Sequence, residues 1–241
     1  RDELLFMVCG LCAGSIYFIA ENVALEYTLT TNVSLITTTS PLFTAMLIGT
    51  VYKSERPTSG MMIGSVVAFL GVACVIFNSS FVIKMNPIGD FLSLAAAISF
   101  AIYSLVLRNL NAHYTVAFIS RKTFFYGVIT ALPFFAFDPP TTPLSTLMRP
   151  AVWGNIVFLS VFASLIGFVV WAHIVKRIGP IKASNWLYIQ PIITLIASAI
   201  ILSEKLTIVG IVGCSLILFG VWLSDYLGRR SVSKSRETDR A

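Results

Sequence analysis

Long apolar runs dominate this chain, and their length limits what it can fold into. A helix needs about 20 largely apolar residues to cross the hydrocarbon core of a bilayer. Runs near that length occupy residues 4–24, 33–52, 60–77, 88–107, 123–137, 152–175, 183–202 and 206–224. Because 56% of the residues are hydrophobic and only 12% are charged, too little polar surface exists to cover a soluble globule. We predict an all-α integral membrane protein with eight transmembrane helices in this chain.

Basic residues are divided unevenly between the two sides that eight alternating helices create. Fourteen Lys and Arg fall on the side of both termini, and three fall on the other side. Such an excess marks the cytoplasmic side. The sequence therefore predicts a multi-pass protein of the cell (cytoplasmic) membrane with cytoplasmic termini. Membrane lipid headgroups account for the net charge of +6, so no nucleic-acid partner is expected.

A short motif occurs twice at matching spacing, each time after an apolar run that contains a proline, Pro41 or Pro191. The motif consists of one Glu and two later glycines: Glu55, Gly64 and Gly71 in the first copy, and Glu204, Gly213 and Gly220 in the second. Five predicted helices separate the two copies. Because five is an odd number, the second copy has the opposite orientation in the membrane. An inverted repeat of this kind is typical of secondary transporters.

We interpret the motif as structural, a polar turn followed by glycines on one helix face that allow close backbone packing. The repeat divides the chain into residues 1–78, a truncated first repeat with three helices, and residues 86–226, a second repeat with five. Two further helices are expected upstream of Arg1. Residues 228–241 are polar and basic and are predicted to form a disordered cytoplasmic tail.

This pattern resembles the drug/metabolite transporter superfamily and, within it, the EamA-like ten-helix transporters. The resemblance rests on the following residues: Pro41, Gly49, Glu55, Gly64 and Gly71, then Gly179, Pro180, Lys182, Ala183, Ser184, Pro191, Glu204, Gly213 and Gly220. It implies inverted five-helix units, cytoplasmic termini and a central solute path between the two halves. The chain departs from the family in lacking about two helices at its beginning.

Both prolines lie about 12 Å into their spans, near the bilayer midplane. Proline leaves a carbonyl without its helical partner, and such breaks persist where they line protein or a watery path. The predicted substrate path comprises both prolines and the polar or aromatic residues before them: Asn32, Thr37, Thr38, Ser40 and Pro41, and Asn185, Trp186, Tyr188, Gln190 and Pro191. The alternative is that these hydroxyls and amides bond to their own or neighbouring helices and only hold the bundle together.

Glu21 and Asn22 are the other candidates within an apolar run. An ionisable group at membrane depth is a functional hypothesis because an unpaired carboxylate there is costly. We expect Glu21 to couple transport to protons or to bind a substrate amine. The alternative is a solvated carboxylate, because Glu21 is close to the outer end of its span.

These observations favour a secondary transporter, an exporter of small metabolites such as amino acids that works by alternating access of two inverted halves. The alternatives are a non-transporting multipass receptor or scaffold and a membrane enzyme. No catalytic constellation is found among two His and four Cys, and Cys9 and Cys12 are interpreted as buried small residues. No cofactor and no metal is expected, the solute is a small molecule, and the oligomeric state is left open.

Overall fold

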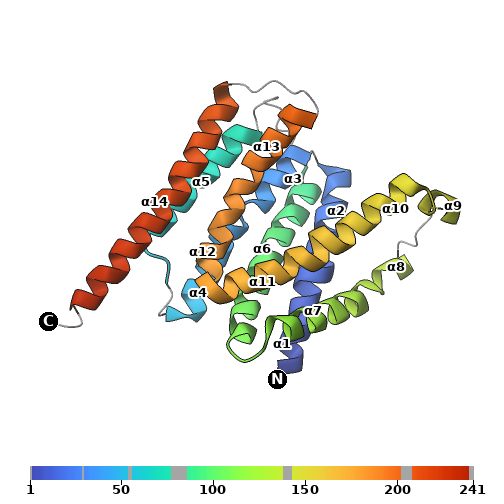
Figure 1. Cartoon of the computed structure of the whole chain (residues 1–241), viewed down its shortest axis with the longest axis horizontal. Coiled ribbons are helices and arrows are strands. Elements are labelled where there is room, and N and C mark those ends of the chain that lie inside the picture. The colour runs from blue at the N-terminus through green and yellow to red at the C-terminus, as the bar shows by residue number, and fades with distance from the viewer. Residues whose placement is uncertain are drawn as a thin grey trace.

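The computed structural model describes residues 2–28, 30–53, 56–76, 86–137, 143–201 and 208–238, and helices make up nearly all of this part (Figure 1). No β-strand occurs among these residues. The prediction of an all-α integral membrane fold is confirmed. Glu55 and Glu204, the acidic residues of the repeated motif, lie outside the described residues.

The first part of the chain folds into three helical segments. Its elements are α1 (Asp2–Cys9), the π-helical η1 (Gly10–Ile16), α2 (Tyr17–Tyr27), α3 (Thr30–Thr37), α4 (Ser40–Val51) and α5 (Ser59–Ile76). The second part supplies five further segments. Its elements are α6 (Pro87–Asn111), α7 (Val116–Ala131), α8 (Phe134–Phe137), α9 (Leu144–Leu147), α10 (Pro150–Val157), the π-helical η3 (Phe158–Ile166), α11 (Gly167–Ile178), α12 (Pro180–Asn185), the 3₁₀ turn η4 (Trp186–Ile189), α13 (Gln190–Ile201) and α14 (Ile208–Thr238).

Five of these helical segments are long and apolar enough to cross a membrane: Asp2–Tyr27, Asn32–Val51, Pro87–Asn111, Pro150–Ile178 and Ile208–Gly228. A shorter apolar helix covers Ser59–Val75. The two other predicted spans are helical as well, over α7 with α8 and over α12 to α13. Successive segments run in opposite directions, and both chain ends lie at the lower edge of Figure 1.

The same backbone irregularities occur in both parts of the chain. The segment from α1 to α2 begins with eight α-helical residues and continues as a π-helix, and so does the segment from α10 to α11. The next segment in each part is interrupted just before its proline, between α3 and α4 or at η4. Figure 1 shows α1–α2 and α10–α11 running in opposite directions. This is the arrangement that an inverted repeat requires.

Two differences from the sequence-based expectation concern helix ends. Helix α7 begins at Val116 rather than Thr123 and therefore includes Arg121 and Lys122. The tail predicted to be disordered from residue 228 instead continues α14 as far as Thr238. Residues 229–238 contain no Gly or Pro that would end a helix.

The largest hydrophobic core lies where α1 and η1 pack between α6 and α7, with α11 closing the cluster. A second core lies between the antiparallel helices α5 and α14. A third joins α4 to the start of α12. In the first core, the first membrane span of the chain packs against helices α6, α7 and α11 of the second part.

Candidate solute-binding site

The predicted path residues before Pro41 use their hydroxyl groups on their own helix. Thr37 Oγ1 donates to the Val33 carbonyl at 2.9 Å, Thr38 Oγ1 to the Ser34 carbonyl at 2.6 Å, and Ser40 Oγ to the Thr37 carbonyl at 2.6 Å. The Thr37 carbonyl is the one that Pro41 cannot bond, whereas the Ser34 carbonyl also accepts the Thr38 backbone N–H at 3.1 Å. Pro41 itself is buried. This geometry favours the structural interpretation for the hydroxyl groups.

Asn32 is buried at the start of the same segment, away from the proline break. Its Nδ2 donates to Thr28 Oγ1 at 3.2 Å, and Thr28 Oγ1 donates to Asp90 Oδ1 at 3.1 Å. Asp90 Oδ2 accepts the Asn86 backbone N–H at 3.2 Å. This chain of bonds joins the end of α2 to the first turn of α6 and fixes where the two spans meet.

The predicted residues before Pro191 do not share one surface. Trp186 is 59% exposed, whereas Tyr188 is fully buried between α5 and α14, and its hydroxyl has no hydrogen-bond partner among the described residues. Gln190 is exposed and Pro191 is buried. A 3₁₀ turn over Trp186–Ile189 turns neighbouring side chains in different directions.

Asn185 lies at the centre of a buried polar network. Ser65 Oγ donates to its Oδ1 at 3.1 Å, and its Nδ2 donates to Ser224 Oγ at 2.8 Å. Ser224 Oγ in turn donates to the Met61 carbonyl at 3.1 Å. These bonds join α5, α12 and α14, and they occupy both polar atoms of the Asn185 side chain. The geometry favours a structural role for Asn185.

The glycines of the repeated motif lie in the seam between α5 and α14. A Cβ placed on Gly71 would lie 2.6 Å from the Ile217 nitrogen, and one on Gly220 would clash with the Ala68 nitrogen. Gly64 and Gly213 face backbone atoms of the opposite helix at similarly short distances. The two helices therefore approach so closely that no side chain fits between them at these four positions.

Glu21 and Asn22 lie near the end of the first span, in α2. Tyr17 Oη donates to Glu21 Oε1 at 3.3 Å, and the carboxylate is half-buried. Asn22 is exposed, and its Nδ2 donates to the Phe18 carbonyl of its own helix at 2.7 Å. Glu21 thus faces other side chains, while Asn22 points away from the bundle interior.

Next to Glu21 is a group of aromatic side chains that the sequence analysis did not single out. We call it the aromatic cluster: Tyr17 and Phe18 of α2, Phe100 and Tyr103 of α6, and Phe168 and Trp171 of α11. Phe100 with Tyr103 and Phe168 with Trp171 are spaced three residues apart, which places each pair on one helix face. This spacing of aromatic residues was the one sequence signal for the cluster, and the same spacing is also common in an ordinary hydrophobic core.

The aromatic cluster joins three helices from both parts of the chain. Tyr17 lies 5.8 Å from Phe100 between ring centroids, Phe100 lies 5.3 Å from Trp171, and Phe18 lies 6.3 Å from Phe168. Within the part of the chain that the structure describes, the buried indole N–H of Trp171 has no hydrogen-bond partner. Four of its rings, Phe100, Tyr103, Phe168 and Trp171, also belong to the first hydrophobic core.

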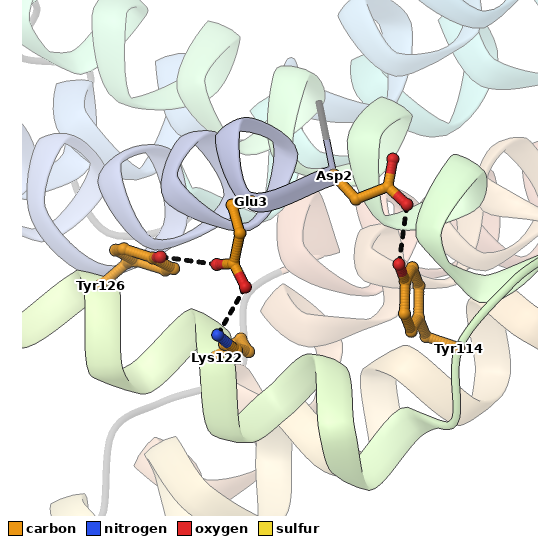
Figure 2. A network of polar contacts seen from close by, with 5 residues as sticks. All are labelled: Asp2, Glu3, Tyr114, Lys122 and Tyr126. Atoms are coloured by element: carbon orange, nitrogen blue, oxygen red, sulfur yellow. Dashed lines mark hydrogen bonds and ion pairs between the residues drawn. The ribbon is translucent and has the colours of Figure 1, made fainter.

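Charged and phenolic groups join the start of α1 to α7 at the other end of the first span (Figure 2). Glu3 accepts from Lys122 Nζ at 2.7 Å and from Tyr126 Oη at 2.6 Å. Tyr114 Oη donates to Asp2 Oδ2 at 2.7 Å, and this bond raises the pKa of the Tyr114 phenol because the carboxylate holds its proton. We call this group the terminal latch: Asp2, Glu3, Tyr114, Lys122 and Tyr126.

No group of three or more His, Cys, Asp or Glu that could hold a metal ion occurs in the described part of the chain. Cys9 and Cys12 are both buried, in the core formed by α1, η1, α6 and α7.

The sequence profile of the EamA-like transporter family matches residues 1–77 and 87–224, which is most of the chain. The chain belongs to the EamA-like transporter family. Its membership confirms the predicted resemblance, and the prediction of a multipass membrane transporter with it. The family consists of transporters rather than enzymes, which agrees at family level with the absence of a catalytic constellation.

Several curated proteins are similar over most of the chain. An "Uncharacterized transporter" of Archaeoglobus fulgidus is 27% identical over 89% of this chain and 74% of its own length. The "Probable terminal-alkyne amino-acid exporter" of Streptantibioticus cattleyicolor is 27% identical over 98% of this chain and 77% of its own length. The "Probable amino-acid metabolite efflux pump" of Escherichia coli is 24% identical over 79% of this chain and 66% of its own length.

A solved crystal structure has a similar fold. It superimposes with a TM-score of 0.79 at 18% identity, covering 93% of this chain and 76% of that chain. At this identity the likeness shows the fold alone.

Proposed function

We propose that this protein is a secondary exporter of small metabolites, with amino acids as the leading class. The proposal is supported by family membership and by the relatives named as an amino-acid exporter and an amino-acid metabolite efflux pump. We place the protein in the cytoplasmic membrane with its C-terminus on the cytoplasmic side, because basic residues concentrate on the side of the termini.

The observation that carries a site for the solute is the aromatic cluster at the contact between the two parts of the chain. Tyr17 and Phe18 come from the first span, and the other four side chains come from α6 and α11 of the second part. In alternating access one half moves against the other around a central site. Side chains contributed by both halves would therefore be rearranged by that motion, as transport requires.

Glu21 is the residue that we propose for coupling. As a carboxylate beside the cluster it can take up a proton when the site opens to one side and release it at the other. The polar groups near Pro41 and Pro191 would then shape the helix breaks that let the halves move, while contacts with the solute fall mainly to the aromatic cluster.

The test is counterflow of radiolabelled amino acids into liposomes that contain the purified protein. We expect accumulation of at least one apolar or aromatic amino acid, and a large loss of it in Phe100→Leu. The matched control is Phe91→Leu, because Phe91 lies on the same helix but is 69% exposed. Equal transport by the two variants would remove the aromatic cluster as the site, and no transport of any amino acid by the folded protein would remove this solute class.

A pH gradient across the same liposomes tests coupling. Accumulation by the native protein should increase with the gradient, and Glu21→Gln should abolish that increase. A gradient effect that survives in Glu21→Gln would assign coupling to another group.

A further inference from the structure

We propose that the first span of the chain, from α1 to α2, is a lever that pivots on Gly127 of α7, so that its two ends separate from α6 and α7 in turn. The inference rests on the proposed transport function and deepens it, because it names the element that moves and the contacts that close each end. It is carried by a buried contact at the middle of the span and by a polar latch at each end.

The middle of the first span touches α7 backbone to backbone. A Cβ on Gly10 would lie 2.6 Å from the Gly127 nitrogen, and one on Gly14 would lie 2.7 Å from the Gly127 Cα. The span is one helical segment of 26 residues, Asp2–Tyr27, and therefore about 39 Å long. Gly14 lies close to its midpoint. Because no side chain stands between the two helices at this point, the span can tilt here without displacing one.

Buried hydrogen bonds hold the pivot from two sides. Ser15 Oγ donates to the Gly127 carbonyl at 3.1 Å, and Ser99 Oγ of α6 donates to the Cys12 carbonyl at 2.8 Å. Ser15 and Ser99 are both buried, so breaking either bond leaves a polar group away from water and is costly. The centre of the span should therefore stay in place while its ends move.

The two ends of the span are held by polar contacts that water can replace. The inner end, at the start of α1, is held by the terminal latch, in which Glu3 is 62% exposed (Figure 2). At the outer end Thr28 Oγ1 donates to Asp90 Oδ1 at 3.1 Å, and both residues are only half-buried. We call this second group the outer latch: Thr28, Asn32, Asn86 and Asp90. Polar contacts open to water are weak, so each latch can open while the pivot stays closed.

The continuity of the first span couples the two latches. A helix that tilts about its centre moves its ends in opposite directions relative to α6 and α7. Separation at the terminal latch then presses the outer latch together, and separation at the outer latch presses the terminal latch together. Because both latches are closed here, the structure is the intermediate in which neither end is open.

A wedge at the outer latch tests this coupling. A Cβ on Gly89 of α6 would lie 2.7 Å from Thr28 Cβ, so Gly89→Ala should push the outer end of the span away from α6. If the span is a lever, the same variant presses the inner end closed. General destabilisation has the opposite effect at the inner end, because it makes local opening more frequent. The sign of the change therefore distinguishes the lever from general loosening.

Maleimide labelling of the full-length protein in liposomes measures both ends. The inner reporter is the buried pair Cys9 and Cys12, in a protein whose other two cysteines are replaced by serine. The outer reporter is Ser93→Cys, in a protein whose four native cysteines are replaced by alanine. Ser93 is buried one helical turn after Gly89, so a reagent reaches it when the outer latch opens.

We expect Gly89→Ala to speed labelling of the outer reporter and to slow labelling of the inner reporter. Each rate should change about threefold to tenfold, the effect of one net hydrogen bond on an equilibrium. In the Lys122→Met protein, whose terminal latch is weakened, Gly89→Ala should bring the faster inner labelling back down. The matched control is Gly154→Ala, because nothing lies within 4 Å of its Cβ position, and it should change neither rate.

Thr28→Val gives a second reading that adds no atom to the seam, since it removes the hydroxyl group of the outer latch. Its control is Thr50→Val, because Thr50 Oγ1 donates to the Leu47 carbonyl of its own helix at 2.8 Å. Thr28→Val should shift both rates in the same directions as Gly89→Ala. Inner labelling that is unchanged or faster in both variants, or outer labelling that changes in neither, would overturn the lever.

The outcomes also separate the lever from the transport proposal. Counterflow of a solute by a protein whose two ends label independently would keep the transporter and discard the lever. Opposite changes of the two labelling rates, without counterflow of any solute, would keep the lever and discard transport.

Discussion

Asn185 is the residue at which the predicted role and the observed contacts differ most. The sequence placed it in the substrate path, whereas its amide joins Ser65 and Ser224 in a buried network. We expect Asn185→Ala to lower the free energy of unfolding by about 1–3 kcal/mol, because two buried hydroxyl groups lose a partner. Chemical denaturation in detergent measures this.

A control for that prediction is Asn22→Ala, because Asn22 is exposed and bonds only to its own helix. Its effect should stay within about 0.5 kcal/mol. If Asn185→Ala instead kept full stability and abolished transport, the role in the substrate path would be restored.

At the scale of elements, the seam between α5 and α14 should tolerate no added atoms. A Cβ on Gly71 would meet the Ile217 nitrogen at 2.6 Å and the Gly213 carbonyl oxygen at 2.7 Å, and backbone atoms cannot move aside as a flexible side chain can. We expect Gly71→Ala to destabilise the protein by about 1–3 kcal/mol through overpacking. The melting temperature in detergent measures the change.

Gly154 in α10 offers the matched substitution, since nothing lies within 4 Å of its Cβ position. Gly154→Ala should be neutral or should stabilise the helix by up to about 1 kcal/mol, because alanine is the better helix former. A similar loss in both variants would mean that helix propensity rather than close packing sets the outcome at Gly71.

Across the whole molecule, the sequence predicted the membrane class and the helical segments because apolar length alone determines them. It missed the start of α7, because Arg121 and Lys122 were expected to end the apolar run, whereas Lys122 pairs with Glu3 of a distant helix. The predicted path residues stay predictions. Prolines and hydroxyls mark helix breaks in any sequence, but whether Thr38 faces solute or its own backbone depends on the local bend.

The aromatic cluster could not be predicted from the sequence either. Its members are separated by up to 154 positions along the chain, from Tyr17 to Trp171. Each is an ordinary aromatic residue in an apolar run. Only the packing of α2 against α6, and of α6 against α11, brings them together, and a single sequence carries no information on those contacts.

The terminal latch gives a prediction for the motion of the whole molecule, because it joins the first span to α7 of the second part (Figure 2). Glu3 is 62% exposed and Lys122 25% exposed, so water screens the pair and it holds this end of the bundle only weakly. Loss of the Glu3–Lys122 pair should make the contact between α1 and α7 open severalfold more often. The core beneath the latch contains Cys9 and Cys12, so opening should speed their reaction with a maleimide in a Cys74→Ser, Cys214→Ser background.

We therefore expect faster labelling in Glu3→Gln and in Lys122→Met, and a return toward the original rate in the charge-swapped pair Glu3→Lys with Lys122→Glu. Lys182→Met is the control, because Lys182 pairs with Asp225 of α14 at 3.9 Å and touches neither α1 nor α7 through that bond. Rescue by the swap would mean that the charge pair itself, rather than either side chain alone, holds this end closed. Labelling that is unchanged in both single variants would assign closure to the apolar core formed by Phe6 and Leu107.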